Sequence, residues 1–146
     1  MKVERSISIA RPPAEILSYM ADIRNDPSWH TDVLDVESST DAVEVGTVFT
    51  VKLKPSMGVT GGTMTVSRLE PGRLVEFHGR VGKMAPTVTN ITEPEEQGTR
   101  VTRRVEMTPP GMMRLMTPMM KRVIGKSNAG FLANLKRLLE GSSISS

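Results

Sequence analysis

The chain has 146 residues, with 19 lysines and arginines against 16 aspartates and glutamates, and no cysteine. This length fits one domain, because a chain of this size buries roughly 70% of the surface of its unfolded form. The lack of cysteine excludes disulfides and thiol chemistry, and two histidines are too few for the common zinc sites, so we expect no metal site.

The net charge of +3 does not predict a nucleic-acid partner. The basic residues are not interleaved with aromatic ones, and glutamates among the predicted strands and turns would interrupt a continuous positive field. No segment reaches about 18 consecutive apolar residues, and the start resembles no signal peptide. We therefore expect a cytoplasmic protein with no membrane span and no nucleic-acid partner.

The first elements are a strand and two short helices. Residues 3–10 alternate between apolar and polar from Ile7 onward, which is typical of a half-buried strand. Pro12 and Pro13 end this strand and suit the first turn of a helix. Apolar residues then recur at helical spacing up to Ile23, and the Asn-Asp-Pro sequence at 25–27 starts a second short helix that carries Trp29.

The middle of the chain is predicted to form a sheet. Runs with period-2 alternation are separated by turns rich in glycine, proline and polar residues, which is the pattern of antiparallel strands. With the first strand, we count seven, the others being residues 33–39, 47–54, 63–69, 73–81, 87–92 and 99–108.

A long helix is predicted after Pro109-Pro110-Gly111. Its apolar residues fall at steps of three and four, on Met113, Met116, Met120, Val123, Ser127, Phe131, Leu135 and Leu138. Pro118 lacks an amide hydrogen, so we expect either a kink there or a short methionine-rich segment followed by a longer helix from Thr117. We expect one domain over residues 1–140 and a flexible tail over 141–146.

Several of these segments resemble the polyketide cyclase/dehydrase group of the START-related superfamily, also called SRPBCC. They are the strand, Pro-Pro turn, helix and D-P-x-W order of residues 3–29, the L-E-P-G-R turn at 69–73, the G-T-R-V-T segment at 98–102, and the helix end at 134–140. The resemblance covers nearly the whole chain. It implies an α+β helix-grip fold, in which a curved antiparallel sheet surrounds the C-terminal helix and encloses an apolar cavity.

The methionines of the terminal helix have two interpretations. Thioether side chains adapt to irregular apolar shapes, so Met113, Met116 and Met120 could line the entrance of a pocket. Alternatively, they fill a core that is short of aromatic residues, of which the chain has five.

Arg103 shares the phase of Val101 and Val105, so a regular strand would point it to the apolar side. An unpaired guanidinium is costly there, and it would have to meet an acid or a ligand. A β-bulge near Arg104 would instead turn Arg103 to solvent, and this second interpretation is slightly favoured. Asn90, in phase with Val88, is a similar case.

His30 and Asp32 are the one base and acid that lie close together in the predicted helical turn after Trp29. Their spacing does not make a ready pair on a helix, and a histidine here is more often a surface residue. His30, Arg103 and Asn90 are the weak catalytic candidates. Trp29 is expected to anchor the second helix or to close one end of the pocket.

The sequence therefore predicts a protein that binds a small hydrophobic or amphipathic molecule, such as a polyketide, a lipid or an aromatic metabolite. The resembled group includes cyclases and dehydratases as well as carriers, so activity stays open, and no metal or nucleotide cofactor is expected. The alternative is a protein-interaction module, cochaperone-like or ribosome-associated; either form would be a monomer or a homodimer. The expected ligand-binding residues are Trp29, Phe49, Met64, Phe77, Arg103, Met113, Met116, Met120, Ser127 and Phe131.

Overall fold

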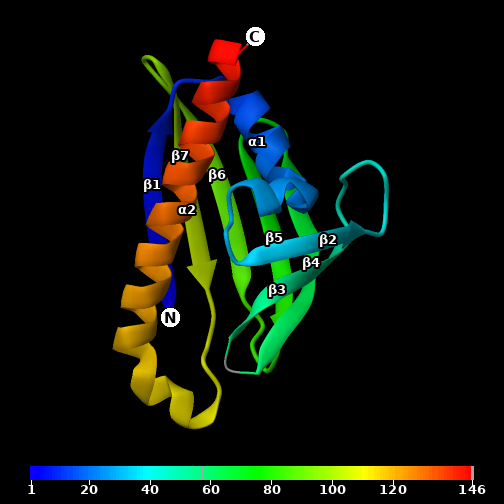
Figure 1. Ribbon diagram of the computed structural model, residues 1–146, viewed down its shortest axis with the longest axis vertical. Coiled ribbons are helices and arrows are strands. Elements are labelled where there is room, and N and C mark those ends of the chain that lie inside the picture. The colour runs from blue at the N-terminus through cyan, green and yellow to red at the C-terminus, as the bar shows by residue number, and fades with distance from the viewer. Residues whose placement is uncertain (57, 146) are drawn as a thin grey trace.

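The computed structural model describes residues 1–56 and 58–145, the last four without their side chains. Within these ranges seven strands form one antiparallel sheet in the order β1-β7-β6-β5-β4-β3-β2, with a long helix along it (Figure 1). This confirms the α+β class and the helix-grip arrangement. The strands are β1 (Lys2–Ile9), β2 (Val33–Ser38), β3 (Val48–Ser56), β4 (Val59–Glu70), β5 (Leu74–Val81), β6 (Thr87–Glu95) and β7 (Gly98–Glu106).

The two short helices after the first strand are confirmed as α1 (Pro13–Ala21) and the 3-10 helix η1 (Ile23–Ser28). The terminal helix is split, as one of the two interpretations of Pro118 predicted, into the 3-10 helix η2 (Gly111–Met116) and α2 (Thr117–Ser145). Pro118 lies in the first turn of α2, where its missing amide hydrogen costs no helical hydrogen bond. The helix end expected at Glu140 is wrong because α2 continues to Ser145; the domain boundary and tail stay predictions.

β4 begins earlier than the sequence indicated, at Val59 rather than near Thr63. Gly61 and Gly62 had suggested a link, but they pair with β3 in extended conformation. Glycine is required by close packing here, since a Cβ on Gly62 would collide with the carbonyl oxygen of Arg80. Met57, in the segment between the predicted strands 47–54 and 63–69, lies outside the described residues.

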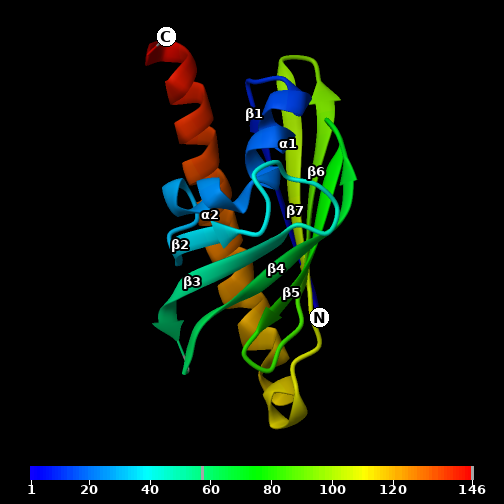
Figure 2. The same ribbon diagram turned by 90° about the vertical axis from the view of Figure 1, so that its right-hand side faces the viewer.

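The buried apolar residues form two groups on the concave face. One lies between the sheet and the α1–η1 region and includes Leu17, Phe49 and Phe77. The other joins α1, β1 and α2 through Ile16, Trp29 and Leu135, among others. The two views together show the sheet bending so that β2 and β3 approach the side on which α2 lies (Figures 1 and 2).

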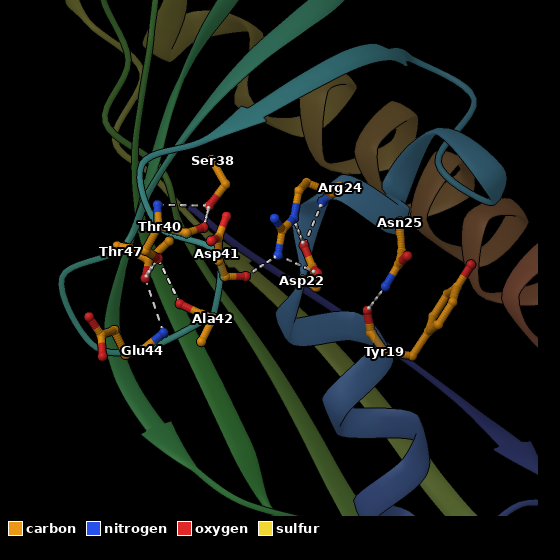
Figure 3. A network of polar contacts seen from close by, with 10 residues as sticks. All are labelled: Tyr19, Asp22, Arg24, Asn25, Ser38, Thr40, Asp41, Ala42, Glu44 and Thr47. Carbon is orange, nitrogen blue, oxygen red and sulfur yellow. Dashed lines mark hydrogen bonds and ion pairs between the residues drawn. The ribbon is translucent and has the colours of Figure 1, made fainter.

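A polar network fixes η1 against the β2–β3 loop (Figure 3). The carboxylate of Asp22 accepts a hydrogen bond from the backbone N–H of Arg24 at 3.1 Å, which caps η1. The Arg24 guanidinium donates to the same carboxylate at 2.8 and 3.0 Å and to the carbonyl oxygen of Asp41 at 2.7 Å. The amide of Asn25 donates to the carbonyl oxygen of Tyr19 at 3.0 Å. These bonds connect η1 to the β2–β3 loop and to α1 and so fix its position.

Replacing Leu135 by alanine tests the packing of α2. Leu135 is fully buried in the second group, so Leu135→Ala should lower the free energy of unfolding by about 2–5 kcal/mol. Leu115→Ala is the matched control, because Leu115 is 82% exposed and the same truncation there should change stability by less than about 0.5 kcal/mol. Urea unfolding followed by circular dichroism measures both; equal losses would mean that α2 is not packed as described.

Candidate functional site

A cavity of about 340 Å³ lies between the concave face of the sheet and α2. Its wall is mostly apolar and comes from residues of β2 to β7, from α1 and η1, and from the middle of α2. The sheet contributes Val51, Phe77 and Val88, among others, and the helix contributes Ile124 and Phe131. A space of this size and composition is typical of a site for a small organic molecule.

Arg103 makes one part of this wall polar. β7 pairs with β1 and β6 without a register shift, so the period-2 pattern carries the side chain inward, and it is only 7% exposed. The favoured interpretation, a bulge that turns Arg103 to solvent, is therefore wrong. Its Nε donates to Oδ1 of Asn128 at 3.3 Å and its Nη1 donates to Oδ1 of Asn90 at 3.4 Å. Its Cζ lies 5.5 Å from the centre of the Trp29 ring, within cation–π range.

Asp26 of η1 is the acid that faces Arg103. Burial raises the pKa of this carboxyl to about 7, although the positive charge of Arg103 acts in the opposite direction. Its Oδ1 is buried and has no hydrogen-bond partner among the described residues. The carboxyl is thus close to half protonated at neutral pH and can exchange a proton there.

His30 is neutral at physiological pH. Burial lowers the pKa of its imidazole to about 3, and repulsion from Arg103 adds to this effect. The ring stacks on Phe131, with centroids 3.9 Å apart and planes 22° from parallel. His30 is therefore a poor general acid, and its contribution to the wall is an aromatic surface with one buried nitrogen, Nδ1, left unpaired within the described part of the chain.

Several buried polar atoms on the Arg103 side of the cavity have no hydrogen-bond partner within the described residues. Buried polar atoms in proteins usually have a partner. In the described residues three side chains of this wall each have a buried atom without one, namely Asp26 Oδ1, His30 Nδ1 and Asn128 Nδ2. Nor does any carboxylate in the described part of the chain form an ion pair with Arg103 within 4.0 Å. Donors and acceptors are thus gathered at one side of an otherwise apolar space.

Many of the residues expected from the sequence do lie on the cavity wall. The catalytic candidates His30, Asn90 and Arg103 line it, and so do four of the expected ligand-binding residues besides Arg103: Met64, Phe77, Ser127 and Phe131. Asp32 also reaches the wall but is exposed and forms no pair with His30 there.

The structure does not place the other expected ligand-binding residues on this wall. Trp29 and Phe49 are almost fully buried in the core behind it. Met113, Met116 and Met120 belong to η2 and the first turn of α2, whereas α2 reaches the cavity only from Val123. The predicted apolar stripe carried one helical period through Pro118, and the 3-10 helix before Thr117 changes its phase.

Asp26 and Asn128 are the polar wall residues that sequence reasoning missed. Asn128 lies three residues before Phe131, so the helical period alone places it on the same face. Asp26 offers no such signal, because an Asp-Pro pair is typical of an exposed turn and its burial depends on how η1 packs.

A curved antiparallel sheet that surrounds a long C-terminal helix, with a cavity between them, defines a helix-grip domain. Residues 1–140 match the model of the family described as polyketide cyclase / dehydrase and lipid transport, and the chain belongs to this family. No curated protein matches the chain. Family membership supports a role in ligand binding or cyclisation.

Solved structures share the fold at low sequence identity. The di-domain ARO/CYC StfQ from the steffimycin biosynthetic pathway superposes with a TM-score of 0.77 at 16% identity, over 97% of this chain and 51% of that one. A protein from Thermus thermophilus gives 0.76 at 17% identity, over 98% of this chain and 99% of that one. The Aha1 dimer from Colwellia psychrerythraea gives 0.70 at 19% identity, over 96% of each chain. At these identities the likeness shows the fold alone.

In the described residues, no group of three or more histidine, cysteine, aspartate or glutamate side chains could hold a metal ion. None of the helices in this part of the chain is long and apolar enough to cross a membrane.

The titrations of Asp26 and His30 predict an unusual pH dependence of stability. Asp26 has its pKa raised from 3.8 to about 7, so the folded state holds the extra proton and stability falls as pH rises through this window. His30 has its pKa lowered from 6.5 to about 3, so the unfolded state holds the extra proton and stability rises with pH. Between about pH 4 and 6 these two contributions oppose each other and nearly cancel.

Single substitutions should separate the two effects. Asp26→Asn leaves the His30 contribution, so the free energy of unfolding should rise by about 1.4 kcal/mol per pH unit relative to the wild type in this range. His30→Gln should give the opposite slope. Urea unfolding at several pH values measures both slopes. Identical slopes in the wild type and the two variants would contradict the burial of these two side chains.

Proposed function

We propose that the cavity binds a small, mostly apolar molecule that carries an oxygen acceptor, either a carbonyl or a carboxylate, at the Arg103 side. The observation that carries this proposal is the buried guanidinium, which lies in an apolar wall without a close ion pair in the described residues. A guanidinium in such a place presents several donors in a planar fork and binds an anionic or carbonyl oxygen strongly.

The shape and chemistry of the remaining wall narrow the ligand class. Phe77, Phe131 and the His30 ring offer flat apolar surfaces, while Asn90 and Asn128 flank the guanidinium. This combination suits a polyketide, a lipid tail with a polar head, or an aromatic metabolite. The family description names polyketides and lipid transport and so supports the first two classes, and the fold shared with a protein described as an ARO/CYC of a biosynthetic pathway supports the first.

A cyclase or dehydratase activity is a second candidate, and Asp26 is the observation that favours it. A carboxyl with a pKa of about 7 can act as an acid or a base at neutral pH. In a ring closure, Arg103 would hold the carbonyl oxygen under attack while the Asp26 carboxylate accepts a proton from the attacking carbon. The same proton then passes to the new alkoxide, so the step leaves the protein unchanged. His30, neutral in the folded protein, is not assigned a proton in this scheme.

The interaction-module alternative predicts an exposed methionine patch rather than an enclosed pocket. Met112, Met116 and Met119 are exposed, and the cavity, which is partly open to solvent, lies further along α2. The cavity favours ligand binding as the main role. A homodimer, as in the neighbour described as the Aha1 dimer, remains the alternative to a monomer.

Two dyes that differ by one charged group test the role of Arg103. Anilinonaphthalene sulfonate carries an anion that its uncharged analogue N-phenylnaphthylamine lacks. We expect both to bind with a stoichiometry near one, and Arg103→Met to weaken the anionic dye at least about tenfold, because a charge-assisted hydrogen bond contributes about 1.5–3 kcal/mol. The uncharged dye should change much less.

Arg104→Met is the matched control, because Arg104 is the next residue on β7 and pairs with Glu4 on the outer face at 2.8 Å. It should bind both dyes like the wild type. Equal weakening of both dyes by Arg103→Met would show that the residue only maintains the fold of the site. Native mass spectrometry of the purified protein then identifies the ligand class, and a ligand on Asp26→Asn that is heavier by one water than that on the wild type supports dehydration.

A further inference from the structure

The start of the terminal helical segment is an exposed apolar surface that the cavity does not use. We call it the η2 tip and define it by four residues: Met112, Leu115, Met116 and Met119. Met112 and Leu115 are 83% and 82% exposed, and η2 has no buried residue. Large apolar side chains clustered at this exposure mark a binding surface on a protein.

Positive charge surrounds the η2 tip. No aspartate or glutamate occurs between residues 107 and 139, whereas Arg114, Lys121, Arg122 and Lys126 are all exposed. Because the sheet is an antiparallel meander, the β3–β4 and β5–β6 turns lie at the same end of the molecule as η2 (Figures 1 and 2). Exposed cations on or beside those turns add to the field: Lys52, Lys54, Arg80 and Lys83.

The acids are concentrated elsewhere. Three reach the η2 end, namely Asp32, Asp35 and Glu106. The β4–β5 and β6–β7 turns, at the opposite end of the meander, carry Glu70, Glu93, Glu95 and Glu96. Arginines beside those acids balance them in part, since Glu70 pairs with Arg68 and Arg73 and Glu95 pairs with Arg100. The cations named at the η2 end form no ion pair within the described residues. The unpaired positive charge therefore lies at the end with the exposed apolar side chains.

We propose that the η2 tip docks on the surface of an anionic phospholipid bilayer. Apolar side chains flanked by cations are the chemistry that binds at the headgroup region, with the methionines and leucine entering the acyl boundary and the cations contacting phosphates. No helix in the described residues is long and apolar enough to span a bilayer, so the contact proposed for this tip is with the surface. A second copy of the chain fits this tip poorly, since the same cations would face one another.

The cavity lies next to this docking surface. Val123 follows Met119 by one helical turn, is 57% exposed, and also lines the cavity. An apolar ligand that enters beside Val123 would thus pass between bilayer and cavity with little exposure to water. This inference goes beyond the proposed ligand binding, because it assigns a second surface and the medium from which the ligand comes.

Vesicle flotation tests the docking surface. The wild type should float with vesicles of mixed phosphatidylcholine and phosphatidylglycerol, should not float with pure phosphatidylcholine, and should lose binding as salt rises. The double variants Leu115→Ser/Met119→Ser and Lys121→Glu/Arg122→Glu should each lower vesicle affinity at least about tenfold. All four side chains are exposed, so circular dichroism and the thermal midpoint should stay as in the wild type.

Matched controls lie at the other end of the molecule. Val45→Ser removes an apolar side chain that is 60% exposed, and Arg73→Glu reverses a charge whose side chain is 75% exposed. Both should bind vesicles like the wild type. The proposal is overturned if the wild type ignores anionic vesicles, if it binds neutral ones equally, or if the controls lose as much as the tip variants. A tip that instead mediates self-association or binding to an acidic protein, without vesicle binding, overturns it as well.

The dye assay keeps this test separate from the proposed function. The tip variants should retain one site for anilinonaphthalene sulfonate, because none of their four residues lines the cavity. Loss of vesicle binding with an intact dye site would locate the docking function in the tip. Vesicle binding by a wild type that has no dye site would refute ligand binding and leave docking in place.

Discussion

The burial of the Arg103 guanidinium is the constraint on which the rest of the site depends. Taking this charge out of water is costly, and the structure offsets the cost with partners from three different elements. Asn90 comes from β6, Asn128 from α2, and the Asp26 carboxyl from η1. The same guanidinium thereby ties the sheet to both helical layers, so the polar side of the cavity and the packing of the fold share one residue.

The neighbours of Arg103 take their protonation states from this arrangement. His30 is kept neutral by burial and by the nearby positive charge, which both lower its pKa. The pKa of Asp26 lies at about 7, because burial raises it more than the attraction of Arg103 lowers it. Arg103, Asp26 and His30, the buried ionisable groups of the wall, consequently carry a net charge between zero and one positive unit. An anionic or strongly polarised oxygen is the group that such a wall stabilises, and a cationic ligand is disfavoured there.

Residues whose neighbours are local were predictable from the sequence, and those whose neighbours are distant were not. Period-2 alternation located the seven strands, although β4 begins earlier than predicted, and Pro118 indicated either a kink or the observed split between η2 and α2, because both signals depend on the backbone nearby. The burial of Asp26 depends on how η1 meets the sheet, and Arg103 pointed inward only if β7 lacked a bulge, which its pairing on both sides decides. The exposure of η2 could not be predicted for a similar reason: Met113 and Met116 were expected at a pocket entrance or in the core, but η2 provides no buried position.

The pairing of β1 with β7 has a consequence for how the domain forms during synthesis. β1 precedes every other strand in the chain, yet its hydrogen-bonding partner is the last strand of the sheet, with Lys2 opposite Glu106. The β2–β7 meander can form from neighbouring segments as they leave the ribosome, while β1 must wait with both edges unpaired. α2, which packs along β1, is translated later still. The cavity is therefore completed only once α2 has emerged, and ligand capture has to follow synthesis of the whole domain.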